Sequence, residues 1–115
     1  MSQAQSVTGA TFDQEVLSSD TPVLVDFWAE WWQPCLLVEP ALEKIAEERS
    51  GELKLVKVNI DEEQALAERY GIASIPTMVL FKDGEPAAAA IGAQPKSAIE
   101  TQLGLGPAST NGSGD

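Results

Sequence analysis

Four stretches of the chain carry the apolar pattern of β-strands. Residues 23–29 form a nearly continuous apolar run rich in β-branched and aromatic side chains, which is typical of a central strand buried on both faces. Residues 53–60 and 77–82 predict two further strands. The Asp83-Gly84 dipeptide predicts a tight hairpin turn into an alanine-rich strand over residues 85–91.

Helical signals fall between these strands and at both ends of the pattern. Residues 12–17 predict a short helix with Thr11 as its N-cap. A further helix is expected to begin at Asp61 as its cap and to run to Tyr70. Residues 95–103 predict a closing helix.

The longest helix is predicted to follow the first strand. Pro34 suits its first turn, and the Ser50-Gly51 pair suits its end. The apolar positions that it is expected to bury recur every three or four residues, and they are Leu37, Val38, Ala41, Leu42, Ile45 and Ala46.

The order of these elements defines the fold class. Two strands with a long helix between them indicate a parallel pair with a right-handed crossover, and the hairpin adds antiparallel strands. We therefore expect one α/β domain over residues 1–103, with a mixed central β-sheet flanked by helices on both faces. Residues 104–115 are rich in Gly, Ser, Asn and Pro, which predicts a disordered C-terminal tail.

Composition and charge narrow the classes of function. Of the 115 residues 43% are apolar, enough for a core, and 18 acidic against 7 basic residues give a net charge of −11. This charge argues against nucleic acid or an anionic membrane as a partner. The N-terminus lacks the features of a secretory signal and no apolar run is long enough to span a bilayer, which predicts a cytoplasmic protein.

The chain has one cysteine, Cys35, and no histidine. A single cysteine excludes an internal disulfide bond. It also excludes a zinc site built by this chain alone, because no histidine adds ligands. We therefore predict no metal and no cofactor.

One segment joins the end of the first strand to the start of the longest helix. Residues 26–35 read Asp-Phe-Trp-Ala-Glu-Trp-Trp-Gln-Pro-Cys, which resembles the thioredoxin family, where an Asp in the strand precedes Trp-Cys-x-Pro-Cys. The resemblance extends over about residues 12–103 and implies the thioredoxin fold. The further matches are Pro40, Lys57, Asn59-Ile60-Asp61, Tyr70-Gly71-Ile72, Ile75-Pro76-Thr77, Phe81-Lys82-Asp83-Gly84 and Gly92.

The chain departs from the family at the first motif cysteine, whose place is taken by Trp32. The resemblance implies that this position holds the nucleophile, a thiolate stabilised by the helix N-terminus, and that Cys35 resolves the mixed disulfide. An indole has no ionisable thiol. The two-electron dithiol–disulfide cycle therefore cannot run within this chain.

The resemblance also implies roles for the residues beneath the motif. Cys35 is expected to lie one helical turn inside the helix, either as a small buried apolar residue or as a functional single thiol. Asp26 is expected to be a buried carboxyl group with a raised pKa. It either assists proton transfer at Cys35 with Lys57 as its partner, or is a buried polar group kept for structure.

The loop before the third strand is the last part of the expected site. The resemblance implies a cis peptide bond between Ile75 and Pro76 that faces the motif. It also implies that the backbone of Ile75 pairs with an extended substrate peptide. We expect an exposed apolar binding patch, while Trp28 is expected to pack in the core. The patch residues are Trp31, Trp32, Ile75, Pro76, Gly92 and Ala93.

Three functions remain open from the sequence. The first is a module that binds extended peptides or protein partners without reducing them. The second is an altered form, natural or engineered, of a general protein-disulfide reductase. Such a form keeps the resolving cysteine, and its partner in electron transport is a thioredoxin reductase. The third is a dimeric single-thiol protein, in which Cys35 from two chains, together with small thiols, holds an iron–sulfur cluster. The exposed tryptophans are compatible with a monomer or a weak dimer.

Overall fold

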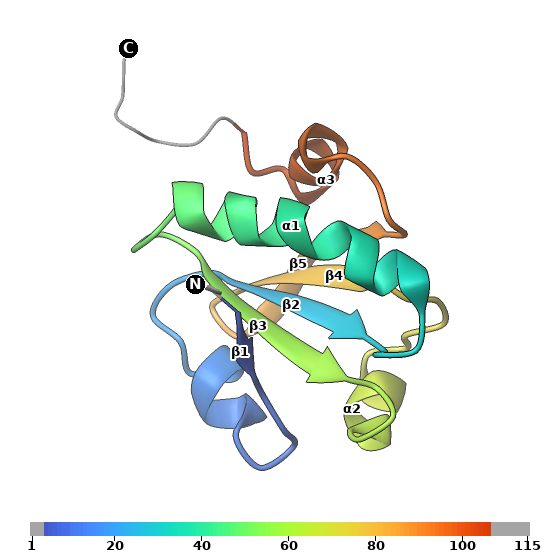
Figure 1. The fold of residues 1–115 in the computed structure, drawn as a ribbon. Helices are drawn as coiled ribbons and strands as arrows, with labels where there is room; N and C mark the ends of the chain where they lie inside the picture. Colours follow the sequence, from blue (N-terminus) through green and yellow to red (C-terminus); the bar gives the residue numbers. More distant parts are fainter. Residues whose placement is uncertain (1–3, 107–115) are drawn as a thin grey trace.

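Five strands form one mixed sheet in the order β1-β3-β2-β4-β5 (Figure 1). The computed structural model describes residues 4–106. Strand β2 pairs parallel with β3 and antiparallel with β4, so it lies at the centre of the sheet. The strands are β1 (Gln5–Ser6), β2 (Val23–Trp28), β3 (Lys54–Asn59), β4 (Thr77–Lys82) and β5 (Glu85–Ile91).

Helices cover both faces of this sheet, as the sequence predicts. Helices α1 (Gln33–Glu48) and α3 (Lys96–Leu103) pack on one face, where they form a core with Leu24, Leu80 and Ala90 (Figure 1). The π-helical turn η1 (Asp13–Leu17) and α2 (Gln64–Arg69) lie on the other face. The fold class predicted from the sequence is therefore confirmed.

Two element boundaries differ from the prediction because side chains make other contacts. Helix α2 begins after Glu63, and Asp61 is not its cap. Asp61 lies in a turn in which its N–H donates to the side-chain oxygen of Asn59 over 2.9 Å. At the first helix, Phe12 is the N-cap, and the Thr11 hydroxyl instead accepts a hydrogen bond from the Thr8 N–H over 3.1 Å.

Strand β1 and the exposure of Leu37 also differ from the prediction. The two residues of β1 are polar and exposed, so they carry no apolar pattern, and only their parallel pairing with β3 defines the strand. Leu37 was expected in the core but is 65% exposed. Helix α1 turns Cys35, Val38 and Leu42 toward the sheet, and this phase directs Leu37 to the surface.

The start of the predicted tail contacts the domain. Gly104 has a φ of 68° and ends α3, which lets the Leu105 N–H donate to the Glu100 carbonyl over 2.9 Å. The buried Arg49 guanidinium donates to the Gly106 carbonyl over 2.6 Å and pairs with the Glu100 carboxylate at 2.9 Å. Arg49 therefore ties the end of α1 to α3 and to the segment after it. The remaining predicted tail, residues 107–115, lies outside the described residues.

Replacing Arg49 tests the contribution of this contact to stability. We expect Arg49→Met to lower the free energy of unfolding by about 2 kcal/mol, because the Gly106 carbonyl loses its donor and Glu100 keeps only Lys96, at 3.2 Å, as an ion-pair partner. Urea denaturation measures the change. Arg69→Met is the matched control, since Arg69 pairs with Asp13 at 4.0 Å on the surface, and we expect it to cost less than about 0.5 kcal/mol. Equal losses would contradict the assignment.

Candidate functional site

The candidate site lies where β2 ends and α1 begins. Trp32 is the N-cap residue of α1 with extended backbone angles, φ −102° and ψ 110°, and Pro34 lies in the first turn. The Cys35 N–H donates to the Trp32 carbonyl over 3.0 Å. The Cys35 side chain is fully buried, whereas Trp32 is 43% exposed. The start of the helix therefore presents an indole to the surface and keeps the thiol beneath it.

Trp32 joins α1 to the loop before β4. Its indole N–H donates to the carbonyl of Ile75 over 3.0 Å. Ile75 precedes Pro76 through a cis peptide bond, and the Pro76 carbonyl accepts the N–H of Gly92 over 2.8 Å. The Trp32 indole thus occupies a backbone acceptor of the loop on the opposite side of the site.

Trp31 makes a separate contact on the other side of the site. Its indole N–H donates to the Asp61 carboxylate over 2.6 Å, and its ring lies 6.0 Å from the ring of Trp32, tilted by 59°. Trp31 remains 67% exposed. The sequence predicted Asp61 as a helix cap and as part of the Asn59-Ile60-Asp61 match, and no sequence pattern signals its bond to Trp31.

Asp26 is buried in the middle of β2 beneath the start of α1. Only 1% of the residue is exposed, and neither carboxylate oxygen has a hydrogen-bond partner among the described residues. Burial raises the pKa of Asp26 to about 7, opposed by the positive charge of Lys57 and assisted by the negative charge of Glu39. The carboxyl group therefore titrates near neutral pH.

Lys57 lies opposite Asp26 in the β2–β3 register but bonds to a different carboxylate. Its ammonium group donates to the side chain of Glu39, on α1, and lies 3.8 Å from the centre of the Trp28 ring. The predicted pairing of Asp26 with Lys57 is thus a charge interaction without a hydrogen bond. Sequence reasoning missed Glu39, although its position four residues after Cys35 places both on one side of the helix.

The surroundings of Cys35 favour the neutral thiol. Burial is the main cause that raises its pKa, and the nearby negative charge of Asp26 acts in the same direction. A hydrogen bond from the Ala29 backbone opposes this shift. Since the thiolate is the reactive form and the side chain is enclosed, Cys35 is a poor nucleophile in the folded chain.

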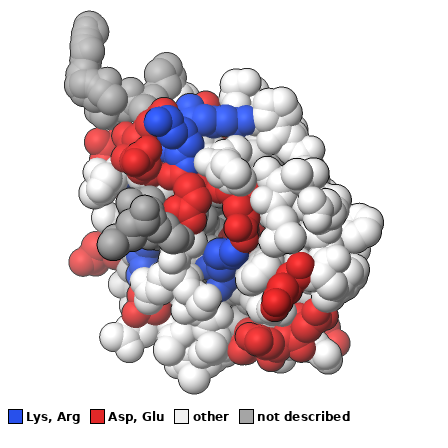
Figure 2. Space-filling view, viewed as in Figure 1, with Lys and Arg blue, Asp and Glu red and all other residues white. Residues whose placement is uncertain are grey.

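An apolar surface surrounds the exposed indoles. Leu36 and Leu37, in the first turns of α1, are 40% and 65% exposed, and the patch predicted from the sequence contained neither of them. Of the predicted patch, Ala93 is exposed, Ile75 and Gly92 are half-buried and Pro76 is buried. Figure 2 shows an uncharged surface over the N-terminal end of α1, with acidic side chains below it near α2.

The described range, residues 4–106, holds neither a metal-binding cluster nor a helix able to span a membrane. No group of three or more histidine, cysteine, aspartate or glutamate side chains in this range is arranged to hold a metal ion. No helix in the same range combines the length and the apolar character needed to cross a membrane.

A cysteine-bearing helix that starts at the central strand, opposite a cis-proline loop, is the architecture of a thiol–disulfide oxidoreductase domain. The thioredoxin family model matches residues 3–104. The chain is 52% identical to thioredoxin 1 of Synechococcus elongatus over 103 residues, 90% of this chain and 96% of that protein. It is 52% identical to thioredoxin of Porphyra purpurea over 84% of this chain and 91% of that protein.

A third relative, thioredoxin of Pseudomonas aeruginosa, is 49% identical over 85% of this chain and 91% of that protein. The matches cover almost all of the described residues. The chain belongs to the thioredoxin family.

The raised pKa of Asp26 predicts a pH dependence of stability. Between the unfolded pKa, about 3.9, and the folded pKa of about 7, the folded chain holds a proton that the unfolded chain has lost. Stability is therefore lost as pH rises through this window, by about 4 kcal/mol in total. We expect Asp26→Asn to remove this loss, so that its advantage over the unmodified chain grows from pH 4 to pH 7 and is constant above.

Urea denaturation at several pH values measures this dependence. Asp20→Asn, on the exposed surface, is the control and should leave the pH profile unchanged. An unmodified chain whose stability does not fall between pH 4 and pH 7 would contradict the assignment.

Proposed function

We propose that this thioredoxin-family chain binds extended segments of protein partners at the surface around Trp32, without running a dithiol cycle. The observation that carries the proposal is the hydrogen bond from the Trp32 indole to the Ile75 carbonyl, 3.0 Å long. It puts a fixed aromatic ring where the family's redox cycle begins. The family acts on protein partners, and the proposal keeps that class of partner while removing the covalent step.

The chemistry of the single thiol supports the loss of the cycle. Reduction of a disulfide by a dithiol needs one thiolate to attack a sulfur atom and a second thiol to displace the bound product. Trp32 supplies no sulfur, and Cys35 is buried with a raised pKa. A chain with this thiol alone cannot form the intramolecular disulfide that takes up the two electrons.

The exposed apolar residues support binding. The two tryptophans, with rings 6.0 Å apart, and two leucines on α1 are exposed, and Trp32 bonds to the loop that holds the cis-proline. Aromatic anchors of this kind carry much of the energy of protein interfaces. Because Trp32 already donates to the Ile75 carbonyl, an extended ligand must displace the indole in order to use that acceptor.

A second candidate is supported by what surrounds Trp32. Asp26, Lys57 and the cis peptide bond before Pro76 are all retained, as in a disulfide reductase altered at one position. Under this reading a thiol at position 32 is the only missing part. The iron–sulfur alternative has less support, because the full burial of Cys35 keeps a cluster ligand from the surface.

Insulin reduction separates these readings. We expect the unmodified chain to reduce insulin at the background rate of dithiothreitol, and Trp32→Cys to restore catalysis. The introduced thiol would lie at the N-terminus of a 16-residue helix, which stabilises a thiolate. It would attack one sulfur of the substrate, and Cys35 would then displace the bound product and close the new disulfide.

Trp31→Cys is the matched control for this assay. It adds a thiol one residue earlier, outside the helix cap, and should stay inactive. Catalysis by the unmodified chain would contradict the loss of the cycle. An inactive but folded Trp32→Cys variant would leave no support for the altered reductase.

Peptide binding tests the groove. The probe is the heptapeptide Lys-Thr-Phe-Thr-Val-Thr-Lys, acetylated and amidated, titrated into ¹⁵N-labelled protein. We expect shifts at the Trp32 indole and the Ile75 amide. Trp32→Phe should bind about fivefold more tightly, because it keeps a ring but frees the Ile75 carbonyl, and one hydrogen bond is worth about 1 kcal/mol.

Trp31→Phe is the control for this gain. It removes the bond to Asp61 and leaves the Ile75 carbonyl engaged, so the affinity for the peptide should not rise. No response at Ile75 in any of the three proteins, and none at Trp32 in the two that retain it, would contradict peptide binding at this groove.

A further inference from the structure

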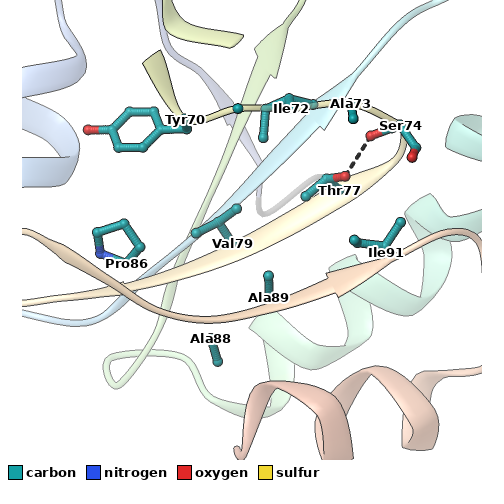
Figure 3. A pocket seen from close by; sticks show the side chains of 11 residues that line it. Tyr70, Ile72, Ala73, Ser74, Thr77, Val79, Pro86, Ala88, Ala89 and Ile91 are labelled. Carbon is teal, nitrogen blue, oxygen red and sulfur yellow. Dashed lines mark hydrogen bonds between the residues drawn. The ribbon is translucent and has the colours of Figure 1, made fainter. Parts of the chain in front are cut away.

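A pocket of about 410 Å³ opens on the face of the sheet opposite α1, between the segment Tyr70–Ser74 and strands β4 and β5 (Figure 3). Its lining is mainly apolar and includes Tyr70, Ile72, Val79, Ala89 and Ile91. The volume lies in the range of ligand pockets, which begins at about 300 Å³. Neither the dithiol chemistry nor the proposed groove at Trp32 uses this pocket.

The walls of the pocket are held in place by the core. The ring of Tyr70 packs against Phe81 at 5.2 Å and against Phe12 at 5.6 Å. At the other end, the Thr77 hydroxyl donates to the Ser74 carbonyl over 2.6 Å (Figure 3). The pocket therefore exists before any ligand binds, which lowers the cost of binding.

The alanines of β5 keep the pocket open. Ala90 points to the face covered by α1 and α3 and is fully buried there. Ala89, on the pocket face, is exposed, and Ile91 is 60% exposed. A methyl group at position 89 leaves the space above Val79, its partner in β4, unfilled.

The outer edge of β5 also carries backbone groups that face away from the sheet. Strand β5 is last in the sheet order, so it has a neighbour on one side only. The Gly92 N–H donates to the Pro76 carbonyl. The backbone N–H and C=O groups of Gly92, and those of Ala90 two residues before it, therefore point toward β4. The Ile91 carbonyl faces outward instead, because it accepts the side-chain amide of Gln94 over 2.8 Å.

Ala89 shares the outward direction of Ile91, two residues away in the same strand. Its N–H and C=O make no hydrogen bond outside the sheet with any residue of the described range. An edge with unpaired groups and an adjacent side-chain pocket is the arrangement that accepts an added strand.

The geometry points to a second protein-binding site: the outer edge of β5 accepts an extended segment of a partner protein as a sixth strand, and the pocket takes one of that segment's apolar side chains. Main-chain hydrogen bonds to Ala89 and Ile91 hold the segment, and alternate side chains meet the pocket face. An aromatic or branched aliphatic side chain matches the apolar walls.

Charge argues for a basic partner segment rather than a second copy of this chain. Each copy carries a net charge of −11, so two copies repel one another. The hairpin that leads into β5 carries Asp83 and Glu85 against Lys82. A segment with lysine or arginine beside that hairpin complements its charge.

The Gln94 side chain limits access to one end of this edge. Its amide bonds to the Ile91 carbonyl and exchanges two hydrogen bonds, of 2.7 and 3.2 Å, with Gln102 on α3. An incoming strand must displace this amide before it pairs with Ile91. The Ala89 groups are free without any such movement.

The same peptide titration tests this site through different resonances. With Lys-Thr-Phe-Thr-Val-Thr-Lys we expect saturable shifts at the amides of Ala89, Ile91 and Ile72. Replacing its phenylalanine with threonine should weaken this response at least about tenfold, because the pocket then stays empty. Equal binding of both peptides would overturn the role of the pocket.

Variants of the protein separate the edge from the groove. Ala89→Lys places a charge over the pocket and should weaken the β5 response at least about tenfold. Gln14→Lys adds the same charge on the exposed surface of η1 and should leave it unchanged. Trp32→Ala should alter only the shifts at Ile75 and leave the β5 response intact.

Three results would overturn the proposal. The first is shifts confined to Trp32 and Ile75, which would support the groove alone. The second is insensitivity of the β5 response to Ala89→Lys in a variant whose spectrum shows a folded chain. The third is dimerisation of the protein without peptide, seen as a concentration dependence in analytical ultracentrifugation and abolished by Ala89→Lys. That result would make a second copy of the chain the occupant of the edge.

Discussion

The candidate site depends on the central position of β2, which pairs on both sides and is buried on both faces. A strand in this position delivers its carboxyl end to the middle of one edge of the sheet, where α1 begins. The same burial places Asp26 under the helix without a hydrogen-bond partner and shields Cys35. Burial favours the neutral form of both side chains, so the Asp26 carboxyl group and the Cys35 thiol are both protonated at mildly acidic pH.

Trp32 changes what the surface of this site offers. In a position where a thiolate would be stabilised by the helix N-terminus, the indole instead spans to the Ile75 carbonyl. One side chain thereby puts an indole where the family motif has a cysteine, occupies a backbone acceptor and exposes apolar surface. The proposed loss of covalent chemistry and the observed hydrogen bond to Ile75 both follow from this one departure from the family motif.

The fold could be predicted from the sequence because long apolar runs and turn residues determine the local backbone conformation. The run over residues 23–29 and the Asp83-Gly84 turn each give a strong signal, and β2 and the β4–β5 hairpin formed as predicted. Strand β1 escaped prediction because its two polar residues are defined only by pairing with β3. The exposure of Leu37 was not predicted, because its position borders the apolar face of the helix in sequence spacing. Only the packing of α1 on the sheet determines which side of that border is buried.

The sequence by itself determined that the chain has one cysteine, that a tryptophan stands at position 32 of the motif, and that the fold is a mixed sheet with helices on both faces. These depend on residue identity and on spacing along the chain. Only the tertiary structure decided that Lys57 bonds to Glu39, that Trp31 and Trp32 donate to acceptors 30 and 43 residues away, and that the alanines of β5 leave a pocket open. Such contacts join side chains from different elements, and their partners are chosen by packing, on which a linear pattern carries no information.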